Sequence, residues 1–376
     1  MRPLGYPLRV LSNQLGRVPR PSFCTFLVCN RCNARCGMCD SWRMPRGTEL
    51  DAEQVRRMFR DLGHLDVVRL TGGEPFLRTD LEALAEAVMA ESAPGVLHIT
   101  TNGSFPERIE RLAQRFSRPK RLRVMVSFDG MAEVHDASRG RRVSFERAIE
   151  SVERLAALRP RGVRVSINHT IISQASLDDH VALRERMSAL GVDTQWVLAY
   201  SESSMYVRQR RGRRAQDLVL LSGYPLHPDL NPTQSLEFAR GELTRVDAIA
   251  DPALRAGKRY YLAGLIARLE QQVEPRPKPK CVALRSHIRL LPNGDVPVCQ
   301  FNTESLGNLL EEGFDALWHK ATASAARRWV DACSGCWAEC EVVPNAVYSG
   351  DLLRHEARRL AGAVARRVRR DPPASM

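Results

Sequence analysis

The chain has 376 residues, a hydrophobic fraction of 44%, and a net charge of +13 from 56 Lys and Arg against 43 Asp and Glu. No stretch approaches the roughly 18 consecutive apolar residues of a membrane span, and the N-terminus has no apolar signal region. These values exclude an integral membrane protein, a small disulfide scaffold and a disordered chain, and they predict a cytoplasmic protein of about two domains.

Ten cysteines fall into two groups, and the first lies near the N-terminus. Without a secretory signal the thiols should stay reduced, so their clustering indicates metal binding rather than disulfides. The spacing Cys32-x3-Cys36-x2-Cys39 is unusual for zinc, whereas three thiolates on one loop suit three irons of a [4Fe–4S] cube. Cys24 and Cys29 lie in an apolar run, where we interpret them as small buried residues of a strand.

Apolar periodicity downstream predicts alternating strands and helices. The expected strands are 22–29, 66–71, 96–101, 122–127, 163–170 and 193–199. The expected helices are about 51–62, 79–91, 105–115, 144–158 and 177–189. This alternation is typical of parallel strands with helices packed outside, as in an α/β barrel or a doubly wound sheet, whose chemistry lies beyond the C-terminal strand ends.

Polar and glycine-rich segments follow three of these strands. Thr71-Gly72-Gly73-Glu74-Pro75 follows the second, and its glycines let the backbone approach a ligand closely. Asn102-Gly103 follows the third strand and Asp129-Gly130 the fourth. Each dipeptide is as typical of a simple turn as of a functional loop. Their regular placement at successive strand ends favours a functional interpretation.

The second group of cysteines lies near the C-terminus. Cys281, Gly294 and Cys299 form a C-x12-G-x4-C pattern whose Pro-Asn-Gly-Asp run predicts a β-hairpin that carries two ligands. Cys333-x2-Cys336-x3-Cys340 follows. Four such thiolates would also satisfy a structural zinc ion, so both metals stay open at this point.

These motifs, together with the segment from Ser127 to Glu146, resemble the radical S-adenosylmethionine (radical SAM) enzymes. The resemblance implies a partial (β/α)6 TIM-like barrel. It also implies that a [4Fe–4S] cluster is held by three cysteines and that S-adenosylmethionine (SAM) binds its open iron. The implied cluster ligands are Cys32, Cys36 and Cys39. The backbone of Gly72 and Gly73 and the Glu74 carboxylate would receive the methionine ammonium, while Asn102, Ser127 and Arg139 would contact the carboxylate and ribose.

The C-terminal cysteines resemble a SPASM or shorter twitch domain, which implies an auxiliary [4Fe–4S] cluster. Five cysteines are too few for the two clusters of a full SPASM domain, so we expect one auxiliary cluster. The first-choice ligands are Cys281, Cys299, Cys333 and Cys336, and Cys340 can replace one of them. Gln300 stands where relatives that mature sulfatases carry an Asp base, so we do not expect sulfatase maturation.

The resemblance implies reductive cleavage of SAM to a 5′-deoxyadenosyl radical, with electrons from a flavodoxin or ferredoxin-type donor. Hydrogen abstraction would then lead to dehydrogenation, epimerisation or a related modification. Only 21 residues precede the first strand, too few for the peptide-binding domain of many relatives, so we expect a small-molecule substrate. A peptide- or RNA-modifying radical SAM enzyme is the alternative. A zinc-containing nucleic-acid-binding protein is the rival from another class, which the absence of a helix-turn-helix or zinc-finger signature disfavours.

We therefore divide the chain into an N-terminal extension and four further segments. These are 1–21, the radical SAM barrel 22–200, a connecting segment 201–257 that can act as a lid, the auxiliary-cluster domain 258–345, and a basic amphipathic tail 346–376. The connecting segment contains the basic run Arg208–Arg214. The tail suits peripheral contact with an anionic membrane or packing on the core, and its narrow apolar stripe favours packing.

Overall fold

The computed structural model describes residues 5–15, 17–118, 121–201, 222–249 and 251–370. Its centre is a seven-stranded sheet in the order β6-β5-β4-β3-β2-β1-β7, in which every pairing is parallel. The strands are β1 (Phe23–Cys29), β2 (Val67–Gly72), β3 (Val96–Thr101), β4 (Leu122–Phe128), β5 (Arg164–Ile171), β6 (Asp193–Leu198) and β7 (His287–Leu290). The first six confirm the predicted strands and the partial (β/α)6 barrel.

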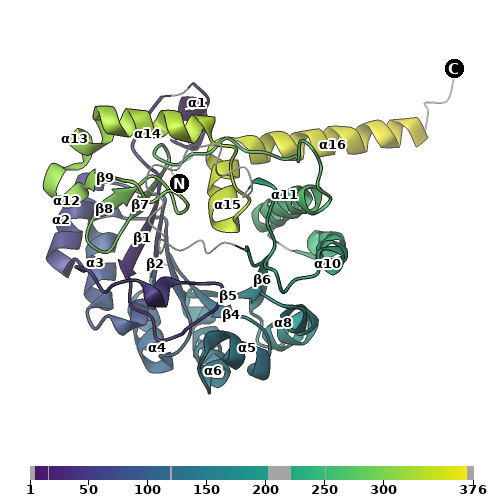
Figure 1. Cartoon of the computed structure of the whole chain (residues 1–376), viewed down its shortest axis with the longest axis horizontal. Coiled ribbons are helices and arrows are strands. Elements are labelled where there is room, and N and C mark those ends of the chain that lie inside the picture. Colours follow the sequence, from purple (N-terminus) through teal and green to yellow (C-terminus); the bar gives the residue numbers. More distant parts are fainter. Residues whose placement is uncertain (1–4, 16, 119–120, 202–221, 250, 371–376) are drawn as a thin grey trace.

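Helices cover the outside of this sheet (Figure 1). Those that follow the barrel strands are α2 (Ala52–Leu62), α3 (Leu81–Ser92), α4 (Pro106–Arg115), α5 (Ala132–Arg139), α6 (Ser144–Ala157), α7 (Gln174–Asp178) and α8 (His180–Ala189). Their starts follow local chemistry: Asp51 and Gln54, for example, form a reciprocal capping box that satisfies backbone amides at the first turn of α2. The buried apolar residues of α2, α3, α4, α6 and α8 then pack on the strands.

The burial of β1 differs from that of its neighbours. All seven of its residues are buried, whereas β3 and β5 alternate between buried and partly exposed positions. A strand covered on both faces is expected to be apolar throughout. Cys24 and Cys29 are fully buried on β1, which confirms their interpretation as buried strand residues.

The predicted C-terminal hairpin is displaced along the chain. Residues His287–Leu290 do not pair with the strand after the Pro-Asn-Gly-Asp turn; they form β7, the seventh barrel strand, parallel to β1. The hairpin is instead formed by β8 (Asp295–Pro297) and β9 (Ser305–Asn308), which pair antiparallel. The physical reason is burial, because all four β7 residues are buried and so suit the packed sheet.

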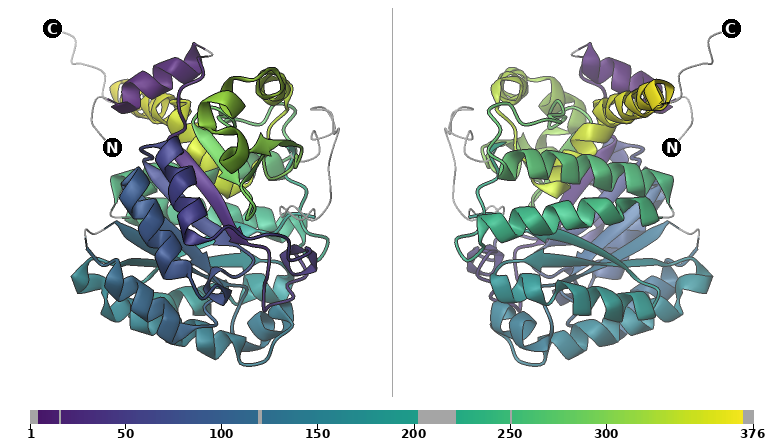
Figure 2. Two further views of the ribbon diagram at one scale, coloured as in Figure 1. Left: turned by 90° about the vertical axis from the view of Figure 1, so that its left-hand side faces the viewer. Right: turned by 90° about the vertical axis from the view of Figure 1, so that its right-hand side faces the viewer.

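The other described helices lie over the open side and one end of the barrel, except that α16 extends away from it. They are α1 (Gly5–Gln14), α10 (Pro232–Arg245), α11 (Pro252–Leu269), α12 (Leu309–Glu312), α13 (Phe314–His319), α14 (Ala321–Ala332), α15 (Glu339–Tyr348) and α16 (Asp351–Arg370). Figure 2 shows α10 and α11 side by side along one flank of the barrel. The predicted connecting segment is thus partly helical, and its basic run Arg208–Arg214 lies outside the described residues.

The described part of the basic tail packs on the body near its start. Tyr260 of α11 donates a hydrogen bond to Asp351 at 2.6 Å, and Leu352 packs against the neighbouring apolar cluster. Leu353 and Leu360 are exposed by 58% and 55%, and α16 projects away from the body (Figure 1). None of the described helices is long and apolar enough to cross a bilayer.

Candidate active site

A cavity of about 1120 Å³ lies inside the barrel and reaches the C-terminal strand ends. All three cysteines of the first motif, Cys32, Cys36 and Cys39, line it. So do five of the six predicted SAM-binding residues, which are Gly72, Gly73, Asn102, Ser127 and Arg139. Segments far apart in the sequence therefore meet at one site because parallel strands end at the same edge of the sheet.

The cysteine loop lies directly on the two glycines. Gly73 N donates to Cys29 O at 2.8 Å, and Glu74 N donates to Arg31 O at 2.7 Å. A Cβ on Gly73 would stand only 1.9 Å from Arg31 O, and one on Gly72 only 2.3 Å from Cys29 O. Glycine is required here because the two backbones touch, which fixes the cysteine loop against the end of β2.

Glu74 is the one predicted SAM-binding residue that does not line the cavity. Its carboxylate is fully buried and accepts hydrogen bonds from Phe76 N (3.0 Å), Thr101 Oγ1 (2.8 Å) and Asn102 N (2.7 Å). Burial raises the pKa of this carboxyl, against the lowering effect of these three donors. Glu74 thus joins the ends of β2 and β3, and its predicted contact with the methionine ammonium stays a prediction.

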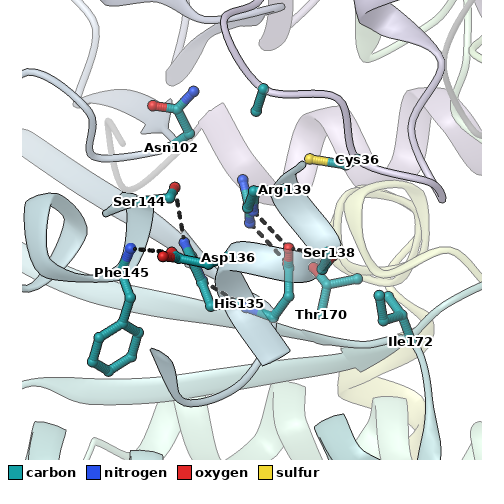
Figure 3. Close-up of polar contacts among 12 residues, drawn as sticks. Cys36, Asn102, His135, Asp136, Ser138, Arg139, Ser144, Phe145, Thr170 and Ile172 are labelled. Atoms are coloured by element: carbon teal, nitrogen blue, oxygen red, sulfur yellow. Dashed lines mark hydrogen bonds and ion pairs between the residues drawn. The ribbon is translucent and has the colours of Figure 1, made fainter. Parts of the chain in front are cut away.

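Asn102 and Arg139 are held in place by polar partners. Asn102 Nδ2 donates to Asn33 Oδ1 at 2.7 Å, which ties the end of β3 to the cysteine loop. The Arg139 guanidinium is bidentate to Asp129, at 2.6 and 2.8 Å, and lies beside Cys36 (Figure 3). Burial alone would lower the pKa of Arg139, but the Asp129 carboxylate raises it overall. Arg139 therefore stays charged next to the cysteines.

The three loop thiols suit a cluster ligand set. Burial raises the pKa of Cys36 to about 11 and that of Cys39 to about 12, while the positive charge of Arg139 lowers both. Such thiols stay protonated until a metal displaces the proton, and the adjacent guanidinium favours the thiolate form. Within the described part of the chain, no three His, Cys, Asp or Glu residues form a group that could hold a single metal ion.

The five C-terminal cysteines gather beside the barrel. The pKa of Cys336 is raised chiefly by burial and further by the nearby thiols of Cys281, Cys299 and Cys340. Cys333 acts in the same way on Cys281 and Cys299. Cys340 differs from the others because it alone lines the barrel cavity, where its thiol donates to Gln300 Oε1 at 3.2 Å.

The histidines near the strand ends are packed inside the structure. His135 accepts from Asp129 N at 3.2 Å and contacts Ser144 (Figure 3), and burial lowers its pKa to about 4. His169 is buried, stacks on His180 and contacts Ser176. Neither lines the cavity, so both fix loops around the site.

Comparison with protein families identifies the two parts of the chain. Residues 26–187 match the radical SAM superfamily, and residues 281–337 match the SPASM iron–sulfur cluster-binding domain.

The chain belongs to the radical SAM superfamily.

It is a radical SAM enzyme whose cofactors are SAM, a [4Fe–4S] cluster and auxiliary iron–sulfur clusters.

The named relatives have different activities. Pre-heme d1 synthase of Dinoroseobacter shibae is 35% identical over 257 residues, which are 65% of this chain and 60% of that protein. Mycofactocin maturase MftC of Mycobacterium ulcerans is 28% identical over 330 residues, 84% of this chain and 79% of that one.

Solved structures share the fold. Streptococcus suis SuiB bound to its precursor peptide SuiA has a TM-score of 0.57 at 14% identity and covers 86% of this chain and 70% of its own. The anSMEcpe structure with bound AdoMet also has a TM-score of 0.57, at 16% identity, with coverage of 92% and 100%.

Three cavity residues were not predicted as functional. Arg69, His98 and Arg123 line the interior of this radical SAM barrel on β2, β3 and β4. Each occupies a polar position between apolar ones, and this period-two alternation is the signal that could have revealed them.

Proposed function

We propose that the protein reductively cleaves SAM and uses the resulting radical to abstract hydrogen from a small molecule held inside the barrel. One observation carries this proposal: the cysteine loop, the predicted SAM-facing residues and a set of deeper polar side chains all line the same cavity. Its volume of about 1120 Å³ is slightly above the usual range of about 300–1,000 Å³ for small-molecule sites.

Within this proposal, Cys32, Cys36 and Cys39 hold the barrel cluster. The backbone of Gly72-Gly73, with Asn102, Ser127 and Arg139, positions SAM. When bound, the cluster and SAM together supply the electron transfer and the 5′-deoxyadenosyl radical. Glu74 is a positioning residue, because its buried carboxylate holds the amide of Asn102 at 2.7 Å.

The auxiliary cluster is assigned to Cys281, Cys299, Cys333 and Cys336. Support comes from the grouping of these four thiols, which act electrostatically on one another. Cys340 also acts on Cys336, but it lines the barrel cavity, which the other four do not. We assign the radical SAM barrel to residues 22–200 and the auxiliary domain to 258–345. A flavodoxin or ferredoxin-type protein is the proposed electron donor, for which the chain's +13 charge suits an acidic partner.

A peptide substrate is the second candidate. It is favoured by likeness to MftC along 84% of this chain, since that relative is named a maturase. The hypothesis of a small-molecule substrate is favoured by the way the cavity is enclosed. One of its walls is formed by α11 and the segment just before it, including Ile249, Leu254 and Lys258.

The test is anaerobic reconstitution with iron and sulfide, followed by reduction with dithionite in the presence of SAM. The proposal expects formation of 5′-deoxyadenosine, and its loss in Cys36→Ser. Candidate substrates can then be screened by the deuterium that they transfer to 5′-deoxyadenosine. If only a leader-bearing peptide, and no small molecule, transfers deuterium, the small-molecule assignment is wrong.

A further inference from the structure

A layer of basic side chains crosses the barrel interior below the proposed SAM site. Arg69 of β2 is in register with Thr25 of β1 and with His98 of β3, and His98 is in register with Arg123 of β4. Arg69, His98 and Arg123 therefore stand at one level of the barrel, and all three line the cavity.

This layer is separated from the SAM-facing residues by a definite length of strand. Arg69 precedes Gly72 by three residues, and Arg123 precedes Ser127 by four. At about 3.3 Å per residue, the basic layer lies on the order of 10 Å deeper in the barrel. The intervening space can hold the body of a small molecule with one end on the basic layer and the other near the cysteine loop.

Arg69 and His98 have unused hydrogen-bonding atoms. Arg69 Nε and His98 Nε2 are both buried and have no hydrogen-bond partner among the described residues. Over the same part of the chain, Arg69 also makes no ion pair, and its recorded contact is with the ring of Phe23, 5.2 Å from its Cζ. Arg69 is partly exposed to the cavity, and its guanidinium has no ion-pair partner among the described residues, so it favours an anionic ligand held in that cavity.

The carboxylates near the layer are engaged elsewhere or lie apart from it. Glu339 acts on Arg69 only from beyond ion-pair distance, and its nearest recorded cation is Lys258, at 3.8 Å. Asp251 accepts from two amides at the start of α11, and its charge acts on Arg123 and Arg164 rather than on Arg69. Asp193 lines the cavity from β6, on the other side of the barrel from β2.

Arg289, another basic residue of the cavity, is already neutralised by an ion pair. Arg289 of β7 lies next to β1 and is ion-paired with Glu341. Burial lowers the pKa of His98 to about 3, assisted by the charges of Arg69 and Arg123, so His98 is a neutral donor or acceptor beside two cations. The local field at this level is therefore positive around β2 to β4.

We propose that this layer binds an oxyanion of the substrate, a carboxylate or a phosphate, with Arg69 as its principal partner and His98 Nε2 as a second donor. The guanidinium fork matches the paired oxygens of either group. This inference rests on the proposed function, because it assigns the charged end of the substrate that the radical SAM site would act on.

The test is thermal unfolding of the reconstituted holoenzyme with inorganic phosphate and, separately, with succinate, each against sodium chloride of the same ionic strength. An ion that binds only the folded protein raises Tm in a concentration-dependent way. A shift with phosphate alone assigns a phosphate group, and a shift with succinate alone assigns a carboxylate. Shifts with both assign a general oxyanion site.

The variant Arg69→Met should weaken anion binding at least tenfold. Without ligand it should have a higher Tm than the wild type, because a guanidinium without an ion-pair partner is removed from the barrel interior. A purely structural Arg69 would give the opposite change in Tm. Arg111→Met is the matched control, since Arg111 is an exposed residue of α4 that pairs with Glu82 at 3.0 Å. It should keep the wild-type shift.

The proposal is overturned if neither ion raises the Tm of the wild type, or if Arg69→Met keeps the full shift. If Arg69→Met fails to fold, His98→Leu provides the second test, and this variant should also bind the anion more weakly. The proposed function fails differently, by loss of 5′-deoxyadenosine formation. A negative anion result with intact SAM cleavage therefore rejects only the anion site.

Discussion

The close contact between Gly73 and the cysteine loop gives the sharpest structural prediction. In Gly73→Ala the new Cβ would stand 1.9 Å from Arg31 O and 2.7 Å from Asn30 O, both backbone atoms. Ordinary contact begins near 3.4 Å, so the loop must retreat by about 1.5 Å. The variant should therefore displace the loop that carries the three cluster cysteines.

The cost follows from the contacts that this shift breaks. Overpacking costs about 1–3 kcal/mol. Loss of the hydrogen bonds Gly73 N to Cys29 O and Glu74 N to Arg31 O adds about 0.5–1.5 kcal/mol each. The free energy of unfolding should therefore fall by about 2–6 kcal/mol, and iron content should fall by about four atoms per chain, the content of one cube.

The assay is iron and sulfide analysis after anaerobic reconstitution, together with absorption near 400 nm and denaturant unfolding. Gly37→Ala is the matched control, because Gly37 lies on the same loop and its Cβ would meet nothing within 4 Å. If Gly73→Ala binds as much iron and is as stable as Gly37→Ala, the reasoning from backbone contact is refuted.

Three further predictions test other parts of the site. Cys32→Ser should lose about four irons, whereas Cys24→Ala should keep its full iron content because Cys24 is a buried strand residue; equal iron loss in both would contradict the ligand assignment. Asp129→Asn should lower the free energy of unfolding by about 3–5 kcal/mol because it leaves Arg139 buried without its partner. Asp315→Asn, which removes the exposed ion pair with Arg20, should lower the free energy of unfolding by less than about 1 kcal/mol. Denaturant titration checks both variants, and a larger loss in Asp315→Asn than in Asp129→Asn would contradict this reasoning. Cys336→Ala should lose the auxiliary iron while Cys340→Ala retains it, and iron analysis showing the reverse would exchange their roles.

The strand and helix order of the barrel could be predicted because its periodicity is local. The apolar run of β1 and the alternating patterns of β3 and β5 are visible within six to eight residues. The seventh strand could not be predicted in the same way. Only four residues long, β7 pairs with β1 from more than 250 positions away, and this pairing depends on packing rather than on a local pattern.

The sequence could predict where the motif residues lie relative to the strands, but not which way their side chains point. The glycine pair and Arg139 line the cavity, as expected from their positions after parallel strands. Glu74, in the same motif, turns inward and accepts from Thr101 and the amide of Asn102, since buried amides at the strand ends need an acceptor. Which side a loop residue faces depends on such partners, which come from a different strand.

The central claim is best tested by reductive cleavage of SAM. The reconstituted wild type, reduced with dithionite, should form 5′-deoxyadenosine from SAM, and Cys36→Ser should form none while it keeps the auxiliary iron. A wild-type protein with its full complement of iron that forms no 5′-deoxyadenosine, or a Cys36→Ser variant that forms it at the wild-type rate, would contradict the assignment of this cavity as the radical SAM site.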